Sequence, residues 1–175
     1  MLRLGPLRLH WSLLLGAALF CALQPSPLLL GGYAAVLGAH VLGHALAVAG
    51  TGLRVEGVML HALGGELLGT GEVSPVRRSL IALSGVLAQA MLLAVALFAV
   101  FPADLAEAFT RRNALMILLN LIPVKPLDGA LAWKLPGRLR AASRMRYRGR
   151  MRSSSAVQKD VADLLQKIRR GTGVR

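Results

Sequence analysis

An uncharged apolar run, Leu80–Phe101, constrains the fold of this chain more than any other feature. Its 22 residues include no Asp, Glu, Lys, Arg or His. A helix rises ~1.5 Å per residue, so a run of this length crosses a hydrocarbon layer about 30 Å thick. With 55% hydrophobic residues and a mean hydropathy of +0.57, the chain of 175 residues is too apolar for an ordinary soluble domain. We therefore predict a polytopic membrane protein.

Three further segments are candidate membrane spans. His10–Leu23 is apolar but brief, and two prolines follow it. Pro27–Gly50 is long enough to span and contains two histidines. A last apolar segment begins near Asn113 and is interrupted by Pro123 and Pro126, a residue type that breaks helices. Together with the run described above, these segments predict about four transmembrane helices.

Residues 51–75 differ from the predicted spans in residue pattern and glycine content. Apolar and polar residues partly alternate over 53–60, and five glycines lie between Gly57 and Gly71. This pattern predicts short strands and turns. The predicted fold class is therefore an all-α polytopic membrane protein with about four transmembrane helices, a small membrane-associated β-hairpin and a basic cytoplasmic helical tail.

Positive charge is concentrated after residue 135. Residues 1–135 hold nine Lys/Arg and six Asp/Glu, whereas residues 136–175 hold twelve Lys/Arg and two Asp. Because Lys and Arg mark cytoplasmic segments, four spans would place both termini in the cytoplasm of a multi-pass protein, in a bacterial-type plasma membrane. The predicted domains are a transmembrane core, residues 1–135, and a basic cytoplasmic tail, residues 136–175.

The tail divides into two parts. Arg138–Arg152 holds seven arginines and is expected to be extended or loosely helical. Residues 153–170 place apolar side chains on one stripe, which predicts an amphipathic helix. The positive charge is a topology signal and also suits anionic lipid. Nucleic acid is disfavoured as a partner, because Tyr147 is the only aromatic residue of the tail.

Two histidines four residues apart lie in the second apolar segment. On a helix, His40 and His44 share one face and can share a metal ion. The zinc-protease pattern H-E-x-x-H carries a Glu after its first His as general base, and here that position is Val41. The pair alone leaves two alternatives: metal ligands, or packed and hydrogen-bonded imidazoles.

Asp128 favours the metal alternative. It lies in Asn120–Gly129, a membrane-associated segment broken by two prolines. A carboxylate is costly there unless it is paired or bound to a cation. Two His and one Asp provide three ligands and leave a fourth position open, as in catalytic zinc sites.

The two motifs resemble those of the site-2 protease family of intramembrane zinc metalloproteases. That family carries H-E-x-G-H-A in one transmembrane helix and N-x-x-P-x-x-P-L-D-G in a later one. His40–Ala45 and Asn120–Gly129 match both patterns except for the Glu. The resemblance covers about residues 5–135 and leaves the tail outside.

The resemblance implies a zinc ion and a peptide substrate. The implied zinc ligands are His40, His44 and Asp128. The residues implied to hold an unwound transmembrane segment of a substrate or partner protein near the metal are Asn120, Gly64 and Gly65. In the family, the Glu takes a proton from the attacking water and passes it to the leaving amine.

Val41 cannot accept that proton, which leaves the enzymatic activity open. Losing a general base costs ~10²–10⁴-fold in rate. The preferred hypothesis is a zinc-binding pseudoprotease that binds a membrane partner, with peptide hydrolysis lost or weakened. One alternative is an active metalloprotease in which Glu66 is a relocated base, while His61 is expected to face water. The other is a metal-free scaffold that binds lipid or protein through its basic tail.

Overall fold

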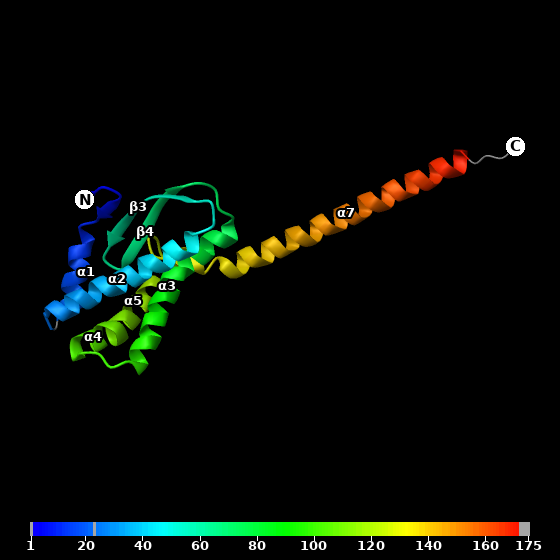
Figure 1. Ribbon diagram of the computed structural model, residues 1–175. Helices are drawn as coiled ribbons and strands as arrows, with labels where there is room; N and C mark the ends of the chain where they lie inside the picture. The colour runs from blue at the N-terminus through cyan, green and yellow to red at the C-terminus, as the bar shows by residue number, and fades with distance from the viewer. Residues whose placement is uncertain (1, 23, 172–175) are drawn as a thin grey trace. The chain divides into compact units, whose positions relative to one another are not determined.

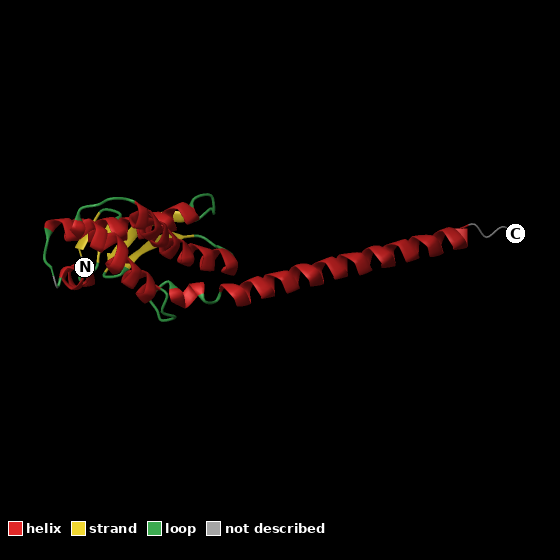
Figure 2. Ribbon diagram, turned by 90° about the horizontal axis from the view of Figure 1, so that it is seen from below, coloured by secondary structure: helices red, strands yellow, loops and turns green. Residues whose placement is uncertain are grey.

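The computed structural model describes residues 2–22 and 24–171 of the chain. These residues are mostly helical, with one four-stranded sheet that Figure 2 draws in yellow. The chain divides into two compact units, Met1–Leu135 and Pro136–Arg175. The sheet and the shorter helices belong to the first unit, and one long helix makes up the described part of the second.

Two helices of the first unit are long and apolar enough to span a membrane. They are α2, Pro27–Val48, and α3, Pro75–Phe98. Each begins with a proline that follows a serine, Ser26 or Ser74, whose side chain accepts backbone N–H groups of the first turn. Both features favour the start of a helix. At ~1.5 Å per residue the helices are roughly 33 and 36 Å long, enough to cross a hydrocarbon layer.

The other two predicted spans are shorter than expected. α1, Ser12–Cys21, has ten residues, or about 15 Å, and Leu23 of the predicted span lies outside the described residues. α5, Asn113–Asn120, ends before Pro123, and a short α6 follows at Gly129–Ala132. Among the described residues two candidate spans are found, so the predicted count of four is not established.

The segment before α5 is also helical. α4, Ala103–Glu107, continues into a π-helical turn, η1, Ala108–Arg112, and then into α5. Glu107 forms ion pairs with Arg111 and Arg112 at 3.2 and 3.3 Å. These charged side chains distinguish the stretch from the two apolar helices.

The sheet is larger than the predicted hairpin. β3, Arg54–His61, and β4, Gly64–Thr70, form the antiparallel hairpin that the glycine-rich segment predicts. Two strands from the start of the chain, β1, Leu2–Leu4, and β2, Leu7–Leu9, extend it, with β2 parallel to β3. The strand order is β1-β2-β3-β4, which places β4 at one end of the sheet.

α2 is the central helix of the first unit. It packs against α3 and against β4 (Figure 1). Its buried face carries His40 and His44 beside apolar residues. Large apolar side chains on the outer faces of α2 and α3 are exposed, among them Leu46, Met91 and Phe98. Polar groups inside and apolar groups outside are the distribution expected of helices surrounded by lipid.

α7, Leu135–Gly171, forms one continuous helix. Arg138–Arg152, expected to be extended or loosely helical, is helical here, and the helix predicted for residues 153–170 is the continuation of the same helix. Arginine is a good helix former, and this preference operates without an apolar stripe. In the second half of α7, five apolar side chains are 50–61% exposed: Val157, Val161, Leu164, Leu165 and Ile168.

Candidate metal centre

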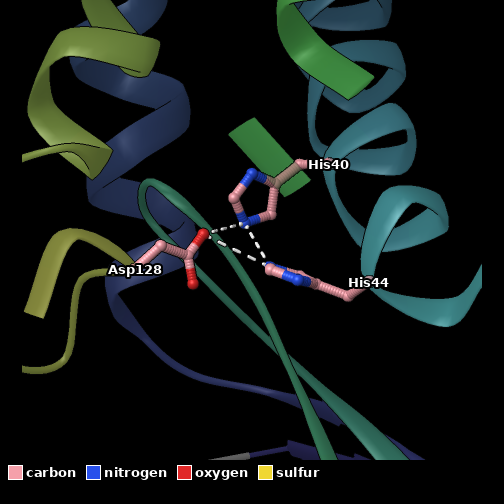
Figure 3. Close-up of side chains that lie close together, drawn as sticks. All are labelled: His40, His44 and Asp128. Atoms are coloured by element: carbon pink, nitrogen blue, oxygen red, sulfur yellow. Dashed lines mark hydrogen bonds and ion pairs between the residues drawn. The ribbon is translucent and has the colours of Figure 1, made fainter. Parts of the chain in front are cut away.

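Three side chains from two distant segments meet at one point of the first unit (Figure 3). His40 and His44 lie one turn apart on α2, and Asp128 comes from the loop that precedes α6. The two Nε2 atoms lie 3.0 Å apart, and Asp128 Oδ2 lies 3.2 Å from the first and 3.3 Å from the second. His40 and His44 are only 2% and 5% exposed. The structure therefore brings together the three residues that the sequence motifs single out.

The backbone of α3 fixes the ring of His44. Its Nδ1 lies 2.7 Å from the carbonyl oxygen of Ile81, which can only accept, so Nδ1 carries the proton. In a neutral ring, Nε2 then presents its lone pair to Asp128. The Ser84 hydroxyl donates to the same carbonyl at 2.6 Å. Partners of this kind orient metal-binding histidines in proteins.

The donor set of the cluster fits a divalent metal ion. Asp128 Oδ2 is buried and accepts no hydrogen bond from the described residues, although two imidazole nitrogens lie beside it. Electron pairs that converge this closely repel unless a proton or a metal ion lies among them. Two imidazoles and a carboxylate are ordinary zinc ligands. The three donor atoms lie within 4.8 Å of one another, as a shared ion requires.

Two glycines make room for the imidazole rings. A Cβ atom on Gly64 would lie 2.7 Å from His40 Nε2, and a Cβ atom on Gly85 would lie 2.5 Å from His44 Nε2. Both distances are shorter than van der Waals contact. Gly65 packs in the same way on Val41, where a Cβ atom would clash with Cγ2. The start of β4 therefore lies directly against the histidine face of α2.

The turn of the hairpin is tied to two helices. Asn120, at the end of α5, is 1% exposed and donates its Nδ2 to the Leu63 carbonyl at 2.7 Å. The Tyr33 hydroxyl, on α2, donates to the Ala62 carbonyl at 2.8 Å. The resemblance implied substrate contact for Asn120. In this structure its amide nitrogen holds the hairpin in place, and the substrate contact stays a prediction.

A cavity of about 410 Å³ opens beside the cluster. Its wall includes the three candidate ligands, Asn120 and the β4 residues from Gly65 to Gly69. Glu66 is exposed and lies on this wall, and it is the one acidic residue of the described wall besides Asp128. Val41, at the position of the missing Glu, is half-buried against Gly65.

Two side chains near the cluster were not predicted as part of it. His61, expected to face water, is half-buried and lines the cavity, and burial, followed by the nearby His40, lowers its pKa. Gln89, on α3, is fully buried with Oε1 3.1 Å from His40 Nδ1. It is the only amide in Leu80–Phe101. A polar residue inside an apolar span marks a functional site, so the sequence did contain a signal for Gln89.

A search of solved structures matches the fold to the Site-2 Protease from Methanocaldococcus jannaschii. The TM-score is 0.59 at 20% sequence identity, and the match covers 77% of this chain and 68% of that chain. The chain has a site-2-protease-like fold. No family model matches the sequence, and no match is found among curated proteins. At this identity the likeness establishes the fold and leaves the activity to be argued from the site.

Proposed function

We propose that this is a zinc-binding membrane protein that holds an extended transmembrane segment of another membrane protein, with peptide hydrolysis lost or strongly weakened. One observation carries the proposal: His40, His44 and Asp128 converge within hydrogen-bonding distance of one another, while Val41 occupies the position next to the first His. These three side chains are suited to bind a catalytic zinc ion, and Val41 cannot accept a proton as the expected Glu would.

The three ligands are suited to a catalytic rather than a structural metal site. Zinc bound there would polarise a carbonyl and activate a water molecule. The protein contributes ring orientation at His44, a carboxylate with one buried oxygen at Asp128 and space at Gly64 and Gly85. Three protein ligands are one fewer than a closed structural site uses.

β4 is suited to hold an extended peptide beside the metal. It pairs with β3 on one side and is the last strand in the order of the sheet. Its residues from Gly65 to Gly69 line the cavity together with the candidate ligands. A peptide can add to such a strand through main-chain hydrogen bonds, while pockets select its side chains. The apolar wall residues Val48, Leu53 and Leu67 favour an apolar segment, such as an unwound transmembrane helix.

The tail suits a different contact. The seven arginines of Arg138–Arg152 and the exposed apolar side chains of the second half of α7 favour the surface of a membrane with anionic lipid. Each basic residue near such a surface contributes about 1 kcal/mol. We propose that the tail binds the membrane surface and that the first unit also binds a metal ion.

The metal content of the purified protein tests the proposal. Wild type is compared with His44→Ala and with His10→Ala, a histidine outside the cluster that contacts Ser12. We expect about one zinc ion per chain in wild type and in His10→Ala, and none in His44→Ala. Wild-type protein without zinc would refute the proposal and leave the metal-free scaffold.

A second candidate function is a working metalloprotease with a relocated base. The position of Glu66 on the cavity wall favours it. Cleavage of a model transmembrane substrate by wild type and Glu66→Gln separates the two. Rapid wild-type cleavage that Glu66→Gln abolishes would establish the relocated base and contradict weakened hydrolysis.

A further inference from the structure

Gln89 is a polar side chain that is buried within an apolar helix. It is 0% exposed on α3, within the uncharged run Leu80–Phe101. An amide moved from water to an apolar environment without hydrogen bonds costs several kcal/mol in free energy. Among the residues that the structure describes, its Oε1 contacts the Nδ1 atom of His40 at 3.1 Å. Its Nε2 is buried without a hydrogen-bond partner among the described residues. Packing alone does not account for a buried amide whose oxygen has a hydrogen-bond partner while its nitrogen has none among the described residues.

We infer that Gln89 is a positioning residue of the metal centre: its Oε1 holds the proton of His40 on Nδ1, so that the Nε2 lone pair faces Asp128 and His44. This inference rests on the proposed zinc site. An oxygen can only accept, so the contact requires a proton on Nδ1 of His40. The free Nε2 is the atom that lies 3.2 Å from Asp128 Oδ2.

The two histidines differ in what secures them. His44 Nδ1 donates to a main-chain carbonyl, that of Ile81, which no substitution removes. His40 Nδ1 depends on a side chain that a single substitution can change. If the Gln89 amide were reversed, its NH₂ group would face Nδ1, and the proton of His40 would move to Nε2 and point at Asp128. That state would donate to the carboxylate and could not bind a metal. The orientation of one amide therefore selects between a metal-binding and a metal-free form of His40.

Three variants in the full-length protein test the inference. Gln89→Met keeps the length of the side chain and removes the acceptor, while Gln89→Glu keeps an acceptor. The matched control is Asn113→Leu, which removes a neighbouring amide that is also 0% exposed and donates to the Gln89 main-chain carbonyl at 2.9 Å. Zn²⁺ affinity is measured by competition with a chelator, and the ligand field is measured by visible absorption of the Co²⁺-loaded protein.

We expect Gln89→Met to weaken Zn²⁺ binding about 10–100-fold and to change the Co²⁺ spectrum. We expect Gln89→Glu to bind at least as tightly as wild type, and Asn113→Leu to bind like wild type despite lower thermal stability in chelator. Wild-type affinity in Gln89→Met would overturn the inference. Equal losses of affinity in Gln89→Met and Asn113→Leu would also overturn it, as would weakened Zn²⁺ binding in Gln89→Glu. Absence of Zn²⁺ from wild type would overturn the proposed function as well, so the two failures are distinguishable.

Discussion

The two sides of the cavity differ in what they retain. On the α2 side, His40, His44 and Asp128 converge, and each imidazole has a hydrogen-bond partner at its far nitrogen. On the β4 side, Gly65 packs on Val41, the α2 residue that follows His40, and Glu66 is exposed on the strand. Holding a metal and using it therefore require separate residues.

Removal of Asp128 is expected to have the largest effect, because it acts on metal binding itself. Asp128→Ala deletes one of three ligands and leaves two buried imidazoles without a counter-charge. We expect Zn²⁺ binding to be lost, together with the stabilisation that bound metal adds, about 4 kcal/mol at a metal concentration 1,000 times Kd. Thermal unfolding with and without Zn²⁺ measures it. A Zn²⁺ response unchanged from wild type would place the metal elsewhere.

Restoring the missing base is expected to have the next largest effect. Val41→Glu introduces a carboxylate beside the ligands, and cleavage of a model transmembrane substrate should rise ~10²–10⁴-fold over wild type. Val41→Gln is the control, because glutamine has the size of glutamate but its amide cannot accept the proton as a carboxylate does. Equal activity in the two variants would mean that the site lacks more than a base.

A methyl group at Gly64 is expected to disturb both sides at once. Its Cβ would lie 2.7 Å from His40 Nε2, so β4 or the ring has to move. We expect Gly64→Ala to cost about 1–3 kcal/mol in the free energy of unfolding and to weaken Zn²⁺ binding. Gly31→Ala is the control, since no atom of the described residues outside its own stretch of helix lies within 4 Å of a Cβ at that position. If both variants behave alike, the close packing of β4 on His40 is not a feature of the protein.

The smallest effect is expected at the hairpin turn. Asn120→Ala removes the bond to the partly buried Leu63 carbonyl and leaves it without this partner, at a cost of about 1–3 kcal/mol. Amide hydrogen exchange at the turn should quicken, while Zn²⁺ affinity stays close to that of wild type because the three ligands are untouched. Loss of the metal would instead show that Asn120 acts at the cluster itself.

Hydropathy predicted the middle of each long helix better than its ends. α2 runs from Pro27 to Val48, close to the predicted Pro27–Gly50. α3 starts five residues before the predicted Leu80, because Ser74 caps it and the charged Arg77 and Arg78 are compatible with a helix. Charge ends an apolar run without ending a helix. The same reason accounts for the helical Arg138–Arg152 segment.

Apart from the metal cluster, the non-local contacts were not predicted from the sequence. The parallel pairing of β2 with β3 joins residues about fifty positions apart, and no local pattern specifies it. The convergence of His40, His44 and Asp128 was expected from motifs, because the spacing of each motif is recognisable alone. The contact of Gln89 with His40 depends on the rotation of α3 against α2, which hydropathy does not encode.

X-ray absorption at the zinc edge of the purified wild-type protein tests the central claim most directly. The account predicts a first shell of nitrogen and oxygen at about 2.0–2.2 Å, with the scattering pattern of two imidazoles, and loss of that shell in Asp128→Ala. A protein without zinc, or a shell that persists unchanged when Asp128 is removed, would contradict it.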